Sequence, residues 1–583
     1  MLALLLEHKA DANLADNEGL TPLHKLARSG FATLCRILLK AKADPLAKDK
    51  HNRQPIQYAA RTNEATIRAL LDFKANVNVA GSDWPSPIVY AASEANLEVL
   101  KLLLDSGADA KSEDPENPGW TALHAACKRS NPDRAFAELL IEHEADVNAV
   151  TKISKTTPLH NAVNSAAVVQ LLLRGGAKVD PRDSDGKTPL MLACENANSA
   201  RVVEILIAAG ADLNAEDNVG FTPLIYCAIH AHPGAASYLL QTSKVKIHHD
   251  ETSTKTNACM FAARHGSIEI VKLLINHDAS IVLRVNKHKD TALHEACRSG
   301  HLSIVKLILE TDASNIVSVN DRHSTAFDEA AEGGHIDIVA FMMNQDGVDP
   351  LHITRRNCIP LFWAAWTGKQ DLVELLMAVE GTDLRHQSTG GWTLFTIAAS
   401  AGLEDLCRTL INRGIADSIV PILAGGVFPL HCATQSNRPG IVELLLAQPG
   451  VDKNARSNKG YTPLWLAVRD GKAKSVMALL AHHVDVDTPD DRGRTPLLIA
   501  TQGYDMEIVQ MLLNGGATQQ LDEALEFVLG DGLGLLEQLL REVGAVEHDE
   551  GFGLEELMAE SSYQAPMDQE MQATSGAENI EEI

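Results

Sequence analysis

Aromatic residues make up only 4% of this 583-residue chain, and several other features are scarce as well. No apolar run approaches the roughly 20 residues that a membrane-spanning helix needs, so we expect no membrane span. The nine cysteines are odd in number and scattered, which argues against a disulfide framework and favours a reducing intracellular compartment, either cytoplasm or nucleus. Cys127, Cys194 and Cys297 occupy one recurring position, where we expect small buried side chains.

No motif indicates catalysis, a cofactor or a metal. The segment DGKTPL (185–190) ends like a phosphate-binding loop, but Pro181 stands where that loop needs glycine. The glycines of GDGLGLL (530–536) have no strand before them. The histidine pairs at 248–249 and 482–483 lack nearby cysteine pairs, and no H-E-x-x-H occurs. We therefore expect no enzyme activity and no cofactor.

Positive charge is also scarce, because the formal net charge is −26. Residues 517–583 contain 17 acidic residues and a single basic one, Arg541. Residues 546–583 have few aromatics and no lysine or arginine, a composition typical of a disordered acidic tail. A nucleic-acid partner is disfavoured, because phosphate binding needs a basic surface.

The chain contains many copies of one short sequence motif, which we call the repeated phrase. TPLHKLA (21–27), TALHAAC (121–127), TPLHNAV (157–163) and TALHEAC (291–297) are variants of it. We call its first residue the Thr position. This position recurs fifteen times at a spacing of about 33 residues, at Thr21, Gln54, Ser86, Thr121, Thr157, Thr188, Thr222, Asn257, Thr291, Thr325, Ile359, Thr393, Phe428, Thr462 and Thr495.

Each repeat has the same internal order. In residues 257–280, a segment built on Ala262 and Ala263 precedes Gly266 and a longer apolar run. The spacing of Ile268, Val271, Leu274 and Ile275 predicts one buried face of a helix. Segments rich in Gly, Asn and Asp, such as 210–224, predict turns between repeats.

Glycine after the longer run suits the left-handed residue that ends a helix, as at Gly107, Gly176 and Gly210. The glycine is missing at Lys9, Lys42, Lys74, Glu144 and Asp278, where we expect weaker or differently shaped turns.

On these motifs the chain resembles the ankyrin-repeat family, whose unit is a β-turn and two helices carrying T-P-L-H-x-A. The resemblance implies an all-α-dominated repeat solenoid, in which helix-turn-helix units with β-turn or hairpin fingers stack into a curved superhelix. It implies four segments: a partial unit with only the second helix and turn (1–20), fifteen repeats (21–522), a degenerate capping repeat (523–545) and the acidic tail (546–583). Either the chain starts with an unpaired helix or it is the C-terminal part of a longer one; the second is favoured, because an uncovered apolar helix harms solubility.

The resemblance implies that the repeated Thr and His are scaffold, with the His hydrogen-bonding across the turns. Equivalent atoms of neighbouring repeats should lie ~10 Å apart, so these histidines cannot share a zinc ion, whose ligands lie ~2 Å from the metal. The residues of this structural motif are Thr21, His24, Thr121, His124, Thr157, His160, Thr291, His294 and His431.

The resemblance also implies that partners bind at the turn tips and at the groove face of the first helices. These positions lie one residue before the Thr position and seven and eight after it. We expect aromatic and basic side chains to be exposed there and to anchor a partner. The candidates are Trp120, Lys128, Arg129, Phe221, Arg264, Arg298, Trp366, Trp392, Tyr461 and Arg469. The alternative is that the turn aromatics only pack on the next repeat.

Six basic residues seven after the Thr position form a predicted basic stripe: Arg28, Arg61, Lys128, Arg264, Arg298 and Arg469. The sequence therefore predicts a monomeric, non-catalytic scaffold that binds a protein or peptide partner of acidic or mixed charge. The alternative is the recognition or regulatory arm of a larger signalling or sensor protein whose effector domain lies upstream of Met1. The acidic tail could also occupy the stripe when no partner is bound.

Overall fold

The computed structural model describes residues 2–79, 84–94, 96–129, 133–197, 199–415, 425–531 and 534–545. The predicted acidic tail (546–583) lies outside these residues. The chain divides into two compact units, Met1–Val348 and Asp349–Ile583, which we call the N-terminal body and the C-terminal body. Each is a stack of helix pairs, as expected for a helical repeat solenoid.

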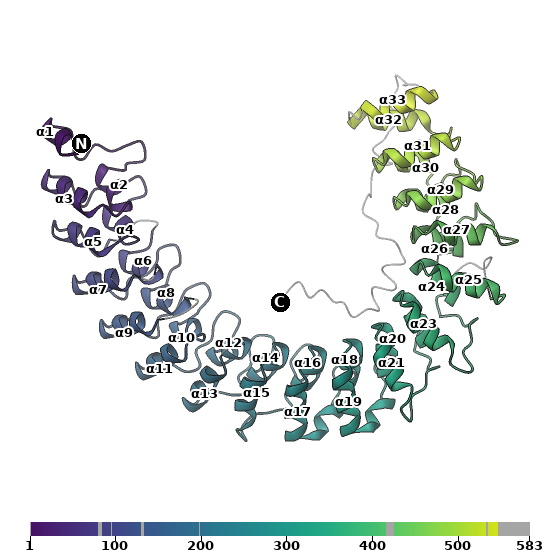
Figure 1. Ribbon diagram of the computed structural model, residues 1–583, viewed down its shortest axis with the longest axis horizontal. Coiled ribbons are helices and arrows are strands. Elements are labelled where there is room, and N and C mark those ends of the chain that lie inside the picture. Colours follow the sequence, from purple (N-terminus) through teal and green to yellow (C-terminus); the bar gives the residue numbers. More distant parts are fainter. Residues whose placement is uncertain are drawn as a thin grey trace. The chain divides into compact units, whose positions relative to one another are not determined.

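In the N-terminal body, Figure 1 shows the first helices of successive repeats side by side in one row and the second helices in a parallel row. The first helices are α2 (Pro22–Arg28), α4 (Pro55–Ala59), α6 (Pro87–Ser93), α8 (Ala122–Lys128), α10 (Pro158–Asn161), α12 (Pro189–Glu195), α14 (Pro223–Ile229), α16 (Ala258–Arg264), α18 (Ala292–Arg298) and α20 (Ala326–Glu332). The second-helix row comprises α1 (Leu2–Glu7), α3 (Ala32–Lys40), α5 (Glu64–Leu71), α7 (Leu97–Asp105), α9 (Arg134–Glu142), α11 (Ala166–Arg174), α13 (Ala200–Ala208), α15 (Pro233–Leu240), α17 (Ile268–His277), α19 (Leu302–Thr311) and α21 (Ile336–Met342).

The C-terminal body repeats this arrangement. Its first helices are α22 (Pro360–Trp366), α24 (Leu394–Ala401), α26 (Pro429–Gln435), α28 (Pro463–Arg469), α30 (Pro496–Gln502) and α32 (Leu521–Asp531). Its second helices are α23 (Gln370–Met377), α25 (Glu404–Asn412), α27 (Pro439–Leu446), α29 (Ala473–Ala481), α31 (Met506–Asn514) and α33 (Gly534–Val543).

The first helices α2 to α30 each start directly after the Thr position. Thr188 has extended backbone (φ −95°, ψ 162°), and its hydroxyl accepts a hydrogen bond from the backbone N–H of Met191. Pro189 takes the first helical position, where its missing N–H has no intrahelical partner to lose. Small residues such as Ala262 and Ala263 are fully buried, which lets neighbouring first helices approach closely.

The buried face of the second helix differs slightly from the prediction. Val271 and Leu274 of α17 are fully buried as expected, but Ile268 and Ile275 are only half-buried. Ile270 is fully buried in their place. The core-facing side of α17 therefore centres on adjacent Ile270 and Val271, because the helix is covered both by its own first helix and by the neighbouring second helices α15 and α19.

The turns that lack glycine take two forms. Lys9, Lys42, Lys74 and Glu144 adopt the left-handed conformation themselves, with φ between 60° and 67°. Asp278 is extended (φ −157°), and a 3-10 helix, η1 (Ala279–Leu283), follows it. Asp312 and η2 (Ala313–Val317) repeat this arrangement one repeat later. The prediction of a differently shaped turn at Asp278 is confirmed.

The segments before the first helices form the fingers. In the finger at 49–53, the Asp49 carboxylate accepts hydrogen bonds from the backbone N–H groups of His51 (2.8 Å) and Arg53 (2.9 Å). Successive fingers are tied by backbone bonds, such as Asn218 N–H to Asp185 C=O (2.9 Å). Within the described ranges, no helix is long and apolar enough to cross a membrane.

Candidate partner-binding surface

The repeated Thr and His form one hydrogen-bonded bridge between successive repeats. In His124, Nδ1 accepts a bond from the Thr121 backbone N–H (3.2 Å), and Nε2 bonds to the Thr156 carbonyl of the next finger (3.2 Å). His24, His160, His294 and His431 make the equivalent bridges to the carbonyls of Arg53, Lys187, Ser324 and Tyr461, at 2.9–3.2 Å. These histidines are scaffold in geometry, because both ring nitrogens are occupied by the protein itself.

The bridge requires a neutral imidazole. Because Nδ1 accepts from a backbone N–H, the proton must lie on Nε2, which donates to the carbonyl. Burial lowers the pKa of His124 and of His431 to about 4 and lowers the pKa of His24, His160 and His294 as well. At neutral pH the whole series is therefore uncharged.

Gln57 makes the same bridge without a titratable group. Its side-chain oxygen accepts from the Gln54 N–H (3.0 Å), and its amide nitrogen donates to the Pro85 carbonyl (3.3 Å). Where this bridge forms, the side chain therefore needs an acceptor and a donor at a fixed separation, but it need not be a histidine.

The candidate aromatics split into two groups. Trp120, Trp366 and Tyr461 are half-buried. Phe221 and Trp392 are each only 8% exposed, so the expectation of exposure was wrong for these two. Phe221 packs edge-to-face on Phe261 at 5.5 Å, and Trp392 packs edge-to-face on Trp366 at 6.0 Å, between ring centroids. At both positions a neighbouring repeat supplies a second ring that covers the first.

Two of the half-buried aromatics, Trp120 and Tyr461, have a basic side chain over the ring. Lys128 is exposed, and its Nζ lies 5.2 Å from the centroid of Trp120, which stacks on His124. Tyr461 stacks on the buried Trp465 at 4.1 Å, with the Arg469 guanidinium 5.8 Å away. Arg129 instead lies over Phe136 of α9 at 4.7 Å, so this candidate packs within its own repeat.

Most of the predicted basic stripe is neutralised within the chain. Arg264 pairs with Glu295 of the next repeat (2.9 Å), and Arg298 pairs with Glu329 of the next repeat (2.9 Å). Both glutamates lie four residues after the Thr position of their own repeat. This site is not among the predicted binding positions, which lie one residue before the Thr position and seven and eight after it. The remaining pairs are Arg298 with Asp290 and Glu295 (both 3.1 Å), Arg61 with Glu94 (3.4 Å) and Arg469 with Asp470 (2.6 Å). The prediction of an open basic stripe was therefore wrong at these four arginines.

The pairs around Glu329 form a buried network. The Glu329 side chain is fully buried and accepts from Arg298, Arg322 (2.7 Å) and Asn320 (2.9 Å). Burial disfavours charge on Arg298, but the surrounding carboxylates outweigh it and raise its pKa. Burial, together with the charge of Glu329, raises the pKa of Glu332 to about 7. The network joins α18 and α20 electrostatically.

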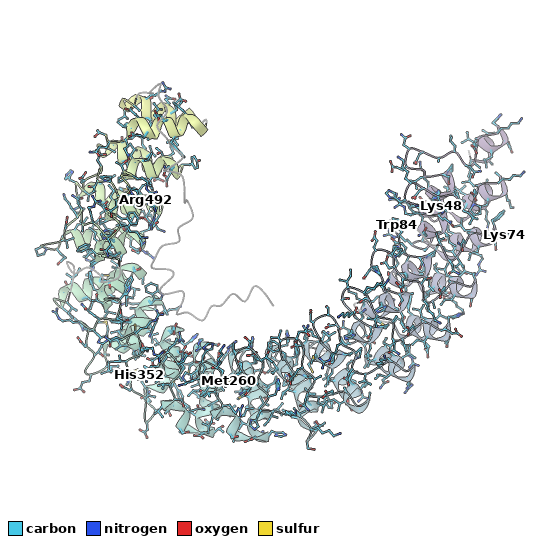
Figure 2. All side chains as sticks on the ribbon, turned by 180° about the vertical axis from the view of Figure 1, so that it is seen from behind. Lys48, Lys74, Trp84, Met260, His352 and Arg492 are labelled. Atoms are coloured by element: carbon cyan, nitrogen blue, oxygen red, sulfur yellow. The ribbon has the colours of Figure 1, made fainter. Side chains whose placement is uncertain are left out.

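One aromatic cluster is not among the residues predicted from the sequence. Trp84 lies 5.0 Å from Tyr58 and 5.6 Å from Tyr90, between ring centroids, and the Arg53 guanidinium lies 4.4 Å from the centroid of Trp84. Figure 2 shows Trp84 on the first-helix side of the N-terminal body, opposite Lys74, which follows a second helix. Trp84 and Tyr90 are half-buried. The available signal was a tyrosine four residues after the Thr position in two successive repeats.

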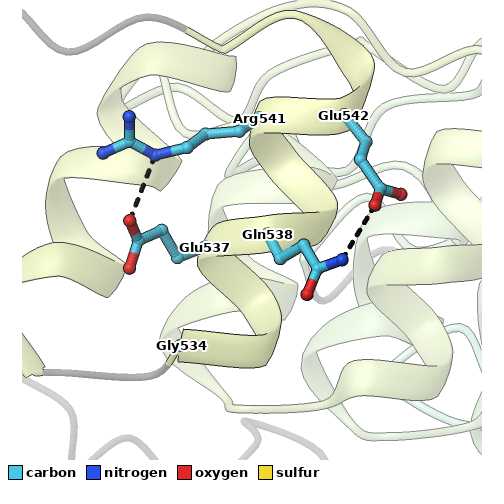
Figure 3. A pocket seen from close by; sticks show the side chains of 5 residues that line it. All are labelled: Gly534, Glu537, Gln538, Arg541 and Glu542. Atoms are coloured by element: carbon cyan, nitrogen blue, oxygen red, sulfur yellow. Dashed lines mark hydrogen bonds and ion pairs between the residues drawn. The ribbon is translucent and has the colours of Figure 1, made fainter.

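A shallow hollow on α33 carries no comparable chemistry. It is lined by Gly534, Glu537, Gln538, Arg541 and Glu542 (Figure 3). Glu537 pairs with Arg541 (3.1 Å), and Gln538 donates to Glu542 (3.0 Å). Its polar side chains thus bond one another along a single helix.

Comparisons with known proteins agree with this geometry. The family model "Ankyrin repeats (3 copies)" matches residues 1–81, 88–183, 164–252, 243–320, 259–354, 361–457 and 449–522. Neurogenic locus notch homolog protein 1 of Cricetulus griseus is 34% identical over 136 residues, which cover 23% of this chain and 5% of that protein. Ankyrin repeat and SOCS box protein 6 of Mus musculus is 41% identical over 95 residues, 16% of this chain and 22% of that protein.

Rabankyrin-5 of Homo sapiens is 32% identical over 125 residues, which cover 21% of this chain and 10% of that protein. The chain therefore matches between 5% and 22% of the length of these relatives. A crystal structure of the ankyrin repeat domain of Bcl-3 has 28% sequence identity and a TM-score of 0.30, and the match covers 35% of this chain and 90% of that chain. Because the family model matches well over half of its residues, the chain belongs to the ankyrin-repeat family.

Proposed function

We propose that the chain is a non-catalytic scaffold of the cell interior that binds a protein or peptide partner through its fingers and first helices. The observation that carries this proposal is the row of half-buried aromatics on neighbouring repeats, Trp84, Tyr90 and Trp120, with Lys128 over the last ring. Trp, Tyr and Arg are the side chains that most often anchor interfaces. Half-buried rings are held in place by their neighbours and keep part of their surface exposed to a partner.

Burial and internal ion pairs reduce the number of candidate side chains that can anchor a partner. Phe221 and Trp392 are buried, and Arg264, Arg298 and Arg469 are paired inside the chain. The proposed anchors are therefore Trp84, Tyr90 and Trp120 with Lys128 in the N-terminal body, and Trp366 and Tyr461 in the C-terminal body. Since internal carboxylates neutralise most of the stripe, a partner of mixed charge fits these positions better than a uniformly acidic one.

A second role is the recognition or regulatory arm of a larger signalling or sensor protein, and the size of the relatives supports it. The matched segment makes up only 5–22% of those proteins, so this array could equally serve as the recognition arm of a larger signalling protein. Partner binding through the same surface is common to both roles.

The test is affinity capture from a reducing lysate, followed by binding measurements with the purified partner. Trp120→Ala and Trp366→Ala should each weaken binding at least tenfold, because truncating an anchor removes buried area at the centre of an interface. Phe31→Ala is the matched control, since Phe31 is 55% exposed and lies at the start of a second helix. Equal binding by parent, tryptophan variants and control would refute the proposed surface.

A further inference from the structure

Two neighbouring fingers carry lysine where the backbone is left-handed. Two residues before the Thr position, φ is positive, and many fingers place glycine there, as at Gly119 (86°) and Gly220 (92°). Lys255 (62°) and Lys289 (63°) occupy the same position in successive repeats. A residue with a Cβ is strained in this conformation. Lysine is therefore unfavourable for the backbone at both positions. Strain of this kind is often found where the side chain has a function, which makes these lysines candidates for binding.

The two fingers are joined by their backbones, which brings a third lysine to the same place. The Lys287 N–H donates to the carbonyl of Thr254, the residue before Lys255, at 2.7 Å. Lys255, Lys287 and Lys289 are all exposed. We call these three residues the finger lysines.

Among the described residues, none of the finger lysines forms an ion pair, whereas the charged groups around them do. Asp250 pairs with Arg284 (2.6 Å) and Asp290 pairs with Arg298 (3.1 Å), while the Asp321 carboxylate is hydrogen-bonded to His288 (3.2 Å). Glu251 is buried and accepts from the backbone N–H groups of Ser253 and Thr254. The carboxylates nearby are thus already occupied, and the finger lysines leave a local positive charge on an acidic chain.

We propose that the finger lysines bind an acidic segment of the partner protein, a step that rests on the proposed function and names the chemistry of the ligand. Equivalent residues on neighbouring repeats lie ~10 Å apart. In a polyproline II segment, residues three apart share one face and are separated by ~9 Å. Acidic residues at every third position would therefore meet Lys255 and Lys289 on successive fingers.

A protein segment fits this surface better than a nucleic acid. The stretches that lead into the fingers expose Leu283 (43%), Val285 (49%) and Val317 (60%), which can take apolar side chains but not phosphates. A nucleic-acid site typically uses many lysines and arginines, which together contact about 6–10 phosphates. The three finger lysines supply fewer.

The probe is a fluorescent peptide of four Glu-Pro-Val repeats, measured by anisotropy against the full chain, with a Gln-Pro-Val peptide as its neutral counterpart. The acidic peptide should bind, more weakly as salt is raised, and the neutral peptide should not. Lys255→Gly combined with Lys289→Gly should weaken binding at least tenfold without lowering the urea midpoint, because glycine relieves the backbone strain. Lys155→Gly is the matched control: Lys155 is also exposed with φ 52°, in a distant finger.

Equal binding by the parent and the double glycine variant would overturn the proposal, as would equal binding of the two peptides. Stronger competition by a twelve-nucleotide oligothymidylate than by the acidic peptide would also overturn it, in favour of nucleic acid. The proposed function is tested separately by Trp120→Ala. If that variant loses the natural partner while the double glycine variant keeps it, the scaffold role stands and the finger lysines are not part of its site.

Discussion

His124 shows how one side chain holds two repeats together. Its bridge satisfies the buried Thr121 N–H, which has no other acceptor among the described residues, and adds a second donor to the Thr156 carbonyl, which also accepts from the Thr151 N–H (3.0 Å). His124→Ala therefore leaves the Thr121 N–H without a partner and removes the tie between the two repeats. We expect the free energy of unfolding to fall by about 2 kcal/mol. His124→Gln should cost less than about 1 kcal/mol, because Gln57 makes both bonds at the equivalent position. Urea unfolding followed by circular dichroism measures both, and an equal loss in the two variants would show that the bridge contributes little.

The same histidine predicts a dependence of stability on pH. The pKa of His124 falls from an ordinary value near 6.5 to about 4 on burial, so below pH 6.5 the unfolded chain takes up a proton that the folded chain refuses. This contribution to stability is complete above pH 6.5 and is lost as the pH falls towards 4. At pH 5.5 it is about 1.4 kcal/mol smaller than at pH 7.5.

Comparing the parent with His124→Gln isolates this effect from opposing groups. Glu332, whose pKa is raised to about 7, contributes with the opposite sign, because the folded state binds its proton more tightly. The drop in unfolding free energy between pH 7.5 and pH 5.5 should be smaller in His124→Gln. Identical pH profiles would mean that His124 titrates normally in the folded chain.

Single positions also show which structural features can be predicted from the sequence. The phrase around each Thr position predicts where a first helix begins, because extended Thr followed by proline has few alternatives. It does not predict whether a side chain beside that position is covered. Phe221 is buried because Phe261 of the next repeat supplies a ring, and the relation between those two positions is visible only when the repeats are stacked.

Between helices, the decisive pairs run from one repeat to the next. Arg264 and Arg298, seven residues after the Thr position, each reach a glutamate four residues after the next Thr position. A comparison of equivalent positions finds the arginines but not their partners, because each pair joins two different positions of adjacent repeats. The helices themselves were predictable from their apolar spacing, whereas the 3-10 helices after Asp278 and Asp312 were not.

The link between α18 and α20 can be weakened by a change that keeps the shape of the side chain. Glu329→Gln removes the fully buried charge that faces Arg298 and Arg322. We expect the unfolding free energy to fall by about 3 kcal/mol, because Arg298 and Arg322 then lose the fully buried carboxylate they share. Asp290, Glu295 and Glu332, which are held by the same two arginines, then remain to balance their charge.

The matched control is Glu269→Gln on α17, whose pair with Lys272 (2.9 Å) has side chains 61% and 45% exposed. Solvent screens such a pair, and its loss should cost less than about 1 kcal/mol. Urea midpoints at constant pH distinguish the two variants. A Glu329→Gln variant as stable as the control would show that the buried network is energetically neutral.

For the array as a unit, stability should be governed by nearest neighbours, since the main helix contacts among the described residues run within a repeat or between adjacent repeats. A lost bridge should therefore weaken its own surroundings rather than the entire chain. Hydrogen exchange followed by mass spectrometry resolves this by segment. His124→Ala should reduce protection around residues 88–183 and leave residues 425–531 unchanged, and His431→Ala should do the reverse. Uniform loss of protection in either variant would mean that the two bodies unfold as one cooperative unit, and the bridges would then have to be understood as global rather than local supports.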